Sequence, residues 1–120
     1  MIVYLVGMPG AGKSVVGKEL AARLGVPFID LDAEIEQDRG KSVGEIFAEL
    51  GEPAFRGMEA ATLVKASMND PAVVACGGGV VLEPANRITL RNTGIAIFLN
   101  VGIERLRERV PPASDRPLIR

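Results

Sequence analysis

The 120-residue sequence contains no histidine and only one cysteine, Cys76. The lack of histidine excludes imidazole acid–base chemistry and histidine metal ligation, so a metal site here would use oxygen ligands and a hard cation. A single cysteine rules out an intramolecular disulfide and is typical of a cytoplasmic chain. Because no histidine is available to activate it, we expect Cys76 to be a small buried residue rather than a nucleophile.

The sequence also lacks a long apolar run and a strong net charge. Nowhere do 18 apolar residues follow one another, and the first residues include no basic segment, so neither a membrane span nor a signal peptide is expected. A net charge of −1 provides no general attraction to nucleic acid or to an anionic membrane. With 48% hydrophobic and 24% charged residues, the composition favours one small globular domain over residues 1–120.

Near the start of the chain, one stretch matches the phosphate-binding pattern G-x-x-x-x-G-K-[ST] at every fixed position. It follows the apolar run 2–6 and opens a helical pattern over residues 13–24, with Val16, Leu20 and Leu24 expected on one face. This strand, loop and helix context is the one that the motif requires. The residues are Gly7, Met8, Pro9, Gly10, Ala11, Gly12, Lys13 and Ser14.

The chemistry of nucleotide phosphates explains these residue types. Glycines allow backbone N–H groups to surround an anion, and the helix that follows adds the positive end of its dipole. Lys13 would reach the outer phosphates of a nucleoside triphosphate, while the Ser14 hydroxyl would ligate a magnesium ion. The alternative is a glycine-rich turn with an exposed lysine.

Two aspartates follow the next apolar segment. Residues 26–31 are expected to form a second strand, and Asp30 and Asp32 would project together at its carboxyl end, where parallel sheets bind their ligands. Alternatively, Asp32 caps a helix that begins at Ala33.

Three helical patterns come next, over residues 33–39, 42–50 and 53–67. Ser42 and Glu45 form a capping box for the second, which would bury Ile46, Phe47 and Leu50. In the third helix, Arg56 and Glu59 lie three residues apart and so on one face. Taken alone, such a pair is an exposed ion pair, worth about 0.3–0.5 kcal/mol.

The second half of the sequence continues the alternation of strands and helices. Strands are expected over residues 72–75 and 95–99, and helices over 83–91 and 103–109. Three consecutive glycines after the third strand indicate either a close backbone approach or a flexible turn. The proline- and arginine-rich segment 110–120 is a lid over a phosphate site or a solvated tail. The whole pattern predicts a parallel α/β sheet with right-handed crossovers.

Taken together, the motifs resemble those of the shikimate kinase family, in order and close to its spacing. The resemblance covers nearly the whole chain and rests on Gly7–Ser14, Asp30-Leu31-Asp32, Gly51-Glu52…Phe55-Arg56…Glu59, Gly77-Gly78-Gly79 and Asp115-Arg116-Pro117-Leu118. It implies a P-loop NTPase-type parallel sheet flanked by helices, with about four strands here against five in the family. It also implies a lid at about residues 110–120, after which the family continues with a second substrate-binding arginine, the last strand, an adenine-side loop and a final helix.

The resemblance implies transfer of the γ-phosphoryl group of ATP to the 3-hydroxyl of shikimate, a step of aromatic amino-acid biosynthesis. On the ATP side, Lys13 and the loop amides would hold the phosphates, Ser14 would ligate Mg²⁺, and Asp30 would act on the hydration shell of the ion. Val15 stands where the family commonly has a hydroxyl residue; its N–H group remains, so a weaker α-phosphate contact is expected. Arg109 would stack near the adenine.

On the acceptor side, the resemblance implies that Asp32 binds the sugar-like hydroxyls and acts as base or orienter for the attacking one. Arg56 would grip the substrate carboxylate and Glu59 would orient Arg56. The backbone of Gly77, Gly78 and Gly79 would approach the substrate. Arg116 would close from the lid to neutralise charge in the transition state, so that Asp32, Lys13 and Arg116 form the catalytic set.

Two other functions remain open on the sequence. One is a non-catalytic nucleotide- or phosphate-binding module with a kinase-like fold, and the other is a kinase for another small carboxylated polyol. Gluconate kinases share the phosphate loop, but are not expected to share the complete set of motifs. In each case we expect a monomer whose partners are ATP and a small acceptor, without nucleic acid or membrane.

Overall fold

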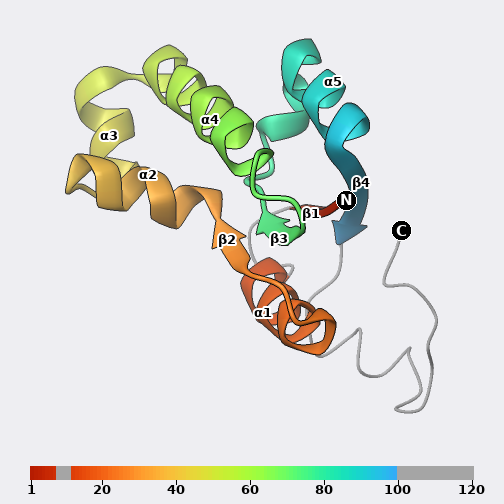
Figure 1. Ribbon diagram of the computed structural model, residues 1–120. Helices are drawn as coiled ribbons and strands as arrows, with labels where there is room; N and C mark the ends of the chain where they lie inside the picture. Colours follow the sequence, from red (N-terminus) through yellow and green to blue (C-terminus); the bar gives the residue numbers. More distant parts are fainter. Residues whose placement is uncertain (8–11, 100–120) are drawn as a thin grey trace.

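The computed structural model describes residues 1–7 and 12–99, and Figure 1 shows how their strands and helices are arranged. Strands alternate with helical segments, with three helices between the second and third strands and a 3₁₀ helix followed by an α-helix between the third and fourth. The elements are β1 (Ile2–Gly7), α1 (Lys13–Leu24), β2 (Phe28–Asp30), α2 (Leu31–Arg39), α3 (Val43–Leu50), α4 (Glu52–Ala66), β3 (Ala72–Ala75), the 3₁₀ helix η1 (Val80–Leu82), α5 (Pro84–Thr93) and β4 (Gly94–Leu99).

Within the described residues, the strands form one parallel sheet in the order β2-β3-β1-β4. Strand β1 is one of the two inner strands, and its Tyr4 pairs with Val74 of β3 and with Ala96 of β4. Parallel neighbours cannot be joined by a tight turn, so each connection crosses the sheet through helices. The predicted fold class, a parallel α/β sheet flanked by helices, is therefore confirmed.

Both faces of the sheet are covered, which explains why β1 is apolar at every position. Ile2, Tyr4 and Val6 point to one face and pack with Leu63 of α4 and Leu90 of α5. The alternate residues point to the other face, where Leu5 packs with residues of α1 that include Val16 and Ala21. In Figure 1, α1 lies on the opposite side of the sheet from α4 and α5. Successive side chains of a strand point to opposite faces, so two-sided cover requires a continuous apolar run.

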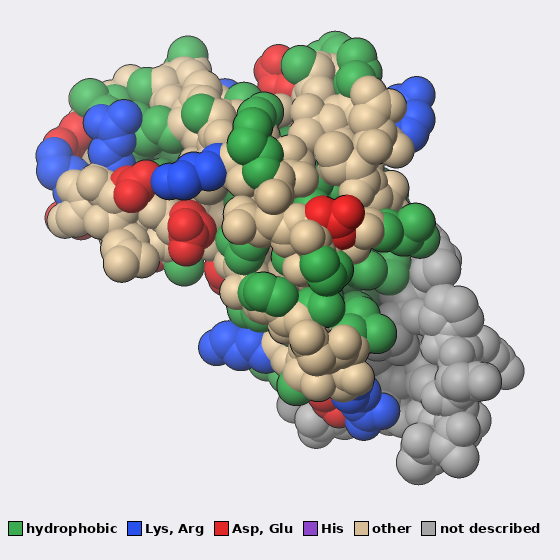
Figure 2. All heavy atoms as spheres, viewed as in Figure 1, with side chains coloured by type: hydrophobic (Ala, Val, Ile, Leu, Met, Phe, Trp, Pro, Cys, Tyr) green, Lys and Arg blue, Asp and Glu red, His purple; other side chains and the backbone are tan. Residues whose placement is uncertain are grey.

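A separate apolar cluster holds α2, α3 and α4 together beside the sheet. Ile35, Ile46 and Phe55, one from each helix, are almost completely buried there, with Phe47 and Met58 packed around them. Figure 1 shows α2 and α3 extending away from the sheet beyond β2, and Figure 2 shows acidic and basic side chains interspersed over this end. We call Ile35, Ile46 and Phe55 the α2–α4 cluster.

The predicted helix and strand positions hold with small changes at their ends. The capping box of Ser42 and Glu45 is present, and Gly40 ends α2 in the left-handed conformation with φ 66°. Two residues of the expected apolar faces are largely exposed: Leu24 and Leu50 lie at the ends of α1 and α3 and are 54% and 51% exposed. In a short helix the last turn extends past the surface that the helix covers, so the periodic pattern overestimates burial there.

The segment after β2 also differs from the prediction. The strand ends at Asp30, and Asp30 caps α2 by accepting a hydrogen bond from the Ala33 N–H group at 3.2 Å. Asp32 is therefore not the cap but a residue of the first helical turn. The expected helix over residues 103–109 and the lid over 110–120 lie outside the described residues. None of the helices within 1–7 and 12–99 combines the length and apolar character needed to cross a bilayer.

Candidate active site

A pocket of about 340 Å³ opens where β2 and β3 end and α1 begins. This is the edge at which open parallel sheets bind ligands, because the loops that follow the strands diverge there. Its wall combines the end of the phosphate-binding motif with both aspartates and the first glycine of the triplet. The lining residues are Gly12, Lys13, Ser14, Val15, Asp30, Asp32, Ala75, Cys76 and Gly77.

Lys13 lies at the start of α1 and donates a hydrogen bond from Nζ to the Gly7 carbonyl oxygen at 2.7 Å. The ammonium group therefore bridges the two ends of the motif. Burial lowers the pKa of Lys13, and the charges of Asp32 and Asp30 oppose that shift. An ammonium group beside carboxylates, at the amino end of a helix, is suited to an anionic ligand with several phosphates.

Ser14 and Asp30 present two oxygen atoms close together on the pocket wall. The Ser14 hydroxyl donates to Asp30 Oδ2 at 3.0 Å, while Asp30 Oδ1 caps α2. Hydroxyl and carboxylate oxygens are the donors that Mg²⁺ prefers, and Mg²⁺ commonly takes only one or two protein ligands beside phosphates and water. The described residues contain no group of three or more His, Cys, Asp or Glu side chains that could hold a metal by themselves. The pair thus fits a magnesium ion that is bound together with a nucleotide.

Asp32 projects from the first turn of α2, and its Oδ1 atom is buried without a hydrogen-bond partner. Burial raises the pKa of Asp32, the charges of Asp30 and Glu36 add to the shift, and those of Lys13 and Arg56 oppose it. An orphaned carboxylate oxygen in a pocket is an energetic cost unless a ligand satisfies it. A ligand hydroxyl that donates to Oδ1 would remove this cost.

Arg56 and Glu59 form a hydrogen-bonded ion pair, with 2.9 Å between Arg56 Nη1 and Glu59 Oε1. The reading of an exposed pair is wrong, because the Glu59 side chain is only 1% exposed. Glu52 accepts a second bond from Arg56 Nε at 3.3 Å, and the rings of Phe47 and Phe55 lie 5.9 and 5.5 Å from the guanidinium. These contacts leave the arginine few alternative orientations.

The three consecutive glycines, Gly77–Gly79, form what we call the glycine turn, which packs against these charged groups. A Cβ atom on Gly79 would lie 2.3 Å from Arg56 Nη1, and one on Gly77 would lie 3.1 Å from Glu59 Oε2 and 3.6 Å from Asp32 Oδ1. Gly79 has φ −84°, a conformation open to other residues. The turn therefore needs glycine at position 79 for close approach and not for backbone conformation.

The structure brings together most of the residues that the sequence predicted for a site. Lys13, Ser14, Asp30, Asp32 and Gly77 line one pocket, and Arg56, Glu59 and Gly79 adjoin it through the glycine turn. Val15 also lines the pocket, while Gly78 is exposed within the turn. The remaining predicted residues, Met8, Pro9, Gly10, Ala11, Arg109 and Arg116, lie outside the described residues.

Two contributors to the site had not been predicted from the sequence. Cys76 is buried as expected, at 1% exposed, but it also lines the pocket, where burial raises the pKa of its thiol. Glu52 was recognised only as part of a motif, although its position four residues before Arg56 on a helix is a signal for an ion pair. Its contact makes Arg56 a guanidinium held by two carboxylates.

The fold and the pocket define a class of protein. A phosphate-binding motif between β1 and α1 of a parallel sheet, with a paired hydroxyl and carboxylate at the next strand end, is characteristic of P-loop nucleotide-binding proteins. Residues 9–120 match the family model described as shikimate kinase, and the chain belongs to that family.

Individual relatives agree with this assignment. The chain is 43% identical over 119 residues to a shikimate kinase of Paracidovorax citrulli and 42% identical over 118 residues to one of Caulobacter vibrioides, with 98% of the chain covered in each case. A solved structure of shikimate kinase from Acinetobacter baumannii in complex with shikimate covers 98% of the chain with a TM-score of 0.80 and 38% identity.

These relatives are longer than the present chain. It spans 65% of the Paracidovorax protein, 59% of the Caulobacter protein and 65% of the Acinetobacter chain.

Proposed function

We propose that the chain transfers the γ-phosphoryl group of ATP to the 3-hydroxyl of shikimate, giving shikimate 3-phosphate and ADP. The observation that carries the proposal is the arrangement of two different half-sites on one pocket. Lys13 and Ser14 form a half suited to phosphates, and Asp32 forms the start of a half suited to a carboxylated polyol. The shikimate bound to the Acinetobacter relative, which matches the chain at a TM-score of 0.80, supports this acceptor.

On the phosphate side, the protein positions groups and stabilises charge, which is most of what phosphoryl transfer asks of an enzyme. Lys13, tied to the Gly7 carbonyl, would place a positive charge beside the β- and γ-phosphates. Ser14 and Asp30 would hold Mg²⁺, Asp30 through the water around the ion. When bound, the ion neutralises phosphate charge.

On the acceptor side, the ionised Asp32 would accept the proton of the attacking hydroxyl through its unpartnered Oδ1 atom. Arg56 would form paired hydrogen bonds with the substrate carboxylate, because the planar guanidinium matches a carboxylate in shape. Glu59 and Glu52 fix its orientation. The glycine turn lets its backbone approach both Arg56 and the substrate.

The remaining roles that the family resemblance implies fall on segments outside the described residues and stay predictions. Arg116 would neutralise transition-state charge from a lid over residues 110–120, Arg109 would contact the adenine, and Met8–Ala11 would complete the phosphate loop. We also propose that the protein is cytoplasmic and has no nucleic-acid or membrane partner. Because the described groups of both half-sites come from one chain, we propose that it acts as a monomer. Gel filtration with light scattering tests the monomer.

The test is a coupled assay that follows ADP release with ATP, Mg²⁺ and shikimate. We expect turnover that depends on all three, and a rise in the apparent KM for shikimate when Arg56 is replaced by Met. The matched control is Arg23→Met, which removes an exposed arginine of α1 and should leave both KM values unchanged. A folded chain that binds ADP without turnover would instead be a non-catalytic module.

The choice of acceptor is tested with the carboxylate itself. An analogue of shikimate that lacks the carboxylate should be a poor acceptor for the wild-type chain, and Arg56→Met should change its apparent KM little. If another carboxylated polyol gives a higher kcat/KM than shikimate, the chain is a kinase for that polyol.

A further inference from the structure

Helix α5 contacts the segment that directly follows the glycine turn. Asn86 is 2% exposed, and its Nδ2 atom donates to the Val80 carbonyl oxygen at 3.0 Å. The neighbouring Arg87 guanidinium donates to the Val81 carbonyl oxygen on the exposed side of the same helix. Two successive carbonyl groups of η1 are thus tied to α5, the first of them in a buried position.

The buried contact acts on the residue that closes the glycine turn. The Val80 N–H group donates to the Gly77 carbonyl oxygen at 3.1 Å, and the Leu82 N–H group donates to that of Gly79, also at 3.1 Å. Val80 is completely buried, so its carbonyl group has no access to water if Asn86 does not reach it. A buried carbonyl without a donor is costly, and the backbone around it would shift to find one.

The other side of the glycine turn faces the acceptor half of the site. Gly79 lies against the Arg56 guanidinium, and Gly77 lies against the carboxylates of Glu59 and Asp32, at the distances given above. These contacts leave little free space, so a shift of the turn changes the position available to Arg56. A continuous path of contacts therefore leads from Asn86 through Val80 and the turn to Arg56.

We infer that Asn86 is a positioning residue for acceptor binding, which it serves by holding the Val80 carbonyl group and thereby the glycine turn against Arg56. The inference rests on the proposed function for the identity of the acceptor. The Asn86 side chain bonds to η1, and Asn86 is not a lining residue of the pocket. Its side-chain amide is required as a donor, because a carbonyl oxygen can only accept.

The experiment replaces Asn86 by Asp, which keeps the shape of the side chain and removes the donor. The matched control is Asn92→Asp, the same change at an exposed position of the same helix. For Asn86→Asp we expect the KM for shikimate to rise roughly tenfold, the effect of one lost buried hydrogen bond, with the KM for ATP within about twofold. Asn92→Asp should change neither. An equal rise in both KM values would overturn the inference.

The pH dependence separates positioning from a general loss of structure. When the introduced carboxyl group is protonated, its O–H group can again donate to the Val80 carbonyl oxygen. The ratio of the shikimate KM of Asn86→Asp to that of the wild type should therefore fall toward one as the pH is lowered and this carboxyl group becomes protonated. Asn86→Ala has no titratable group at this position, so the ratio of its shikimate KM to that of the wild type should be raised by the same factor at every pH. This variant also replaces Asn86→Asp in the experiment if Asn86→Asp does not fold.

Hydrogen exchange at the turn needs no substrate and so separates this inference from the proposed function. In Asn86→Asp or Asn86→Ala, the amides of Val80 and Leu82 should exchange faster than in the wild type, while those of α1 should not. Unchanged exchange at Val80 and Leu82 overturns the inference, whether or not the chain phosphorylates shikimate. A wild-type chain that exchanges slowly at the turn but does not phosphorylate shikimate refutes the proposed function alone.

Discussion

Replacing Arg56 by Met should destabilise the chain in a manner that depends strongly on pH. The Glu59 side chain is 1% exposed, and Arg56 is the cation that pairs with its carboxylate. Burial already raises the pKa of Glu59, with the bond from Arg56 opposing the shift. Without Arg56, the folded chain must either bury an unpaired charge or hold Glu59 protonated, and the nearby charge of Asp32 favours protonation.

Holding Glu59 protonated costs less free energy than burying its unpaired charge, so the cost of the substitution follows from the protonated state. The ordinary pKa of Glu59 is 4.5, and each unit of pH above it costs about 1.4 kcal/mol to keep the carboxyl protonated. Relative to the wild type, in which the pKa of Glu59 is already raised, the loss of unfolding free energy at pH 7 is therefore at most about 3 kcal/mol, at the lower end of the range for breaking a buried ion pair. At pH 5 it falls below about 1 kcal/mol. The sign is that of a group whose folded pKa lies above its unfolded value, so stability is lost as the pH rises.

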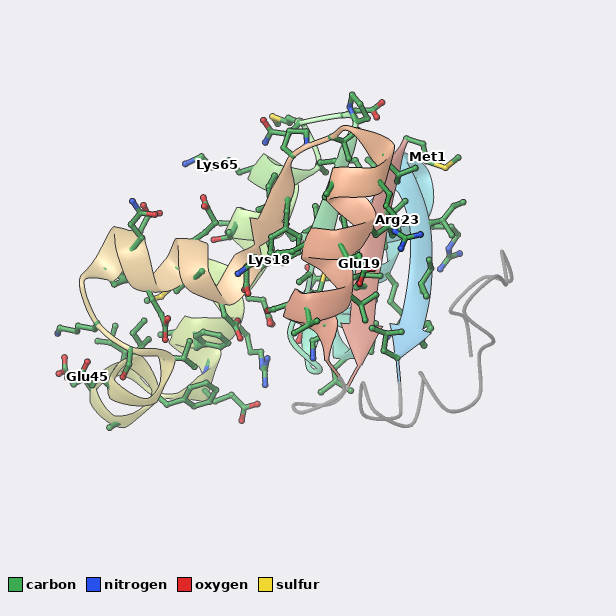
Figure 3. The ribbon with its side chains drawn as sticks, turned by 90° about the horizontal axis from the view of Figure 1, so that it is seen from below. Met1, Lys18, Glu19, Arg23, Glu45 and Lys65 are labelled. Atoms are coloured by element: carbon green, nitrogen blue, oxygen red, sulfur yellow. The ribbon has the colours of Figure 1, made fainter. Side chains whose placement is uncertain are left out.

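Urea unfolding of the wild type and the variant at pH 5 and pH 7 measures both values. The matched control is Arg23→Met, since Arg23 pairs with Glu19 at 3.1 Å on the exposed side of α1, where Figure 3 shows the two side chains next to each other. That loss should be at most about 0.5 kcal/mol at either pH. The double variant Arg56→Met/Glu59→Met removes the buried charge and should lose the pH dependence. A cost for Arg56→Met that is equal at the two pH values would refute the reasoning.

Three further predictions concern activity. Gly79→Ala should raise the KM for shikimate by about tenfold or more, because the new methyl group displaces the Arg56 guanidinium. The control Gly57→Ala, on the open side of α4, should leave this KM unchanged, and steady-state kinetics measures the KM of both variants. Lys13→Met should lower kcat/KM for ATP by about 100-fold without loss of the fold, as measured by the coupled assay and circular dichroism, because a charge beside the transferred group is removed. Burial raises the pKa of Asp32 above its ordinary value of 3.8, so kcat/KM should fall with decreasing pH at values above 3.8 as this base becomes protonated; a flat profile down to pH 4 would contradict the proposed role of Asp32.

The regular part of the fold could be predicted because local signals and tertiary packing agree. The apolar run of β1 and the glycine after α1 fixed the positions of the first two elements, and the box of Ser42 and Glu45 fixed the start of α3. The predicted start of α2 was wrong because two sequence signals competed there. Asp30 satisfied the strand pattern and also the capping preference, and the structure uses it for both, so that α2 begins two residues earlier than expected.

The sequence predicted which residues form the site but not how deeply its charged groups are buried. Sequence spacing put Arg56 and Glu59 on one face of a helix, but whether that face is solvated depends on what packs on it. One group that packs against Glu59 is Gly77 of the glycine turn, which is distant in the sequence. The same holds for Asn86, whose buried contact with Val80 depends on a 3₁₀ turn that no periodic pattern signals.

The α2–α4 cluster has a consequence for how such a chain can diverge. Ile35, Ile46 and Phe55 form a core separate from the clusters on the two faces of the sheet, and Arg56 lies next to one of its members. Substitutions within this cluster act on the helices that carry Asp32 and Arg56, whereas Lys13 and Ser14 lie on α1, which packs in a different cluster. The proposed phosphate half and the proposed acceptor half thus depend largely on different cores, joined at Asp30, which bonds to Ser14 and caps α2. A lineage could exchange one acceptor for another by repacking a few helical residues, with the phosphate chemistry kept intact.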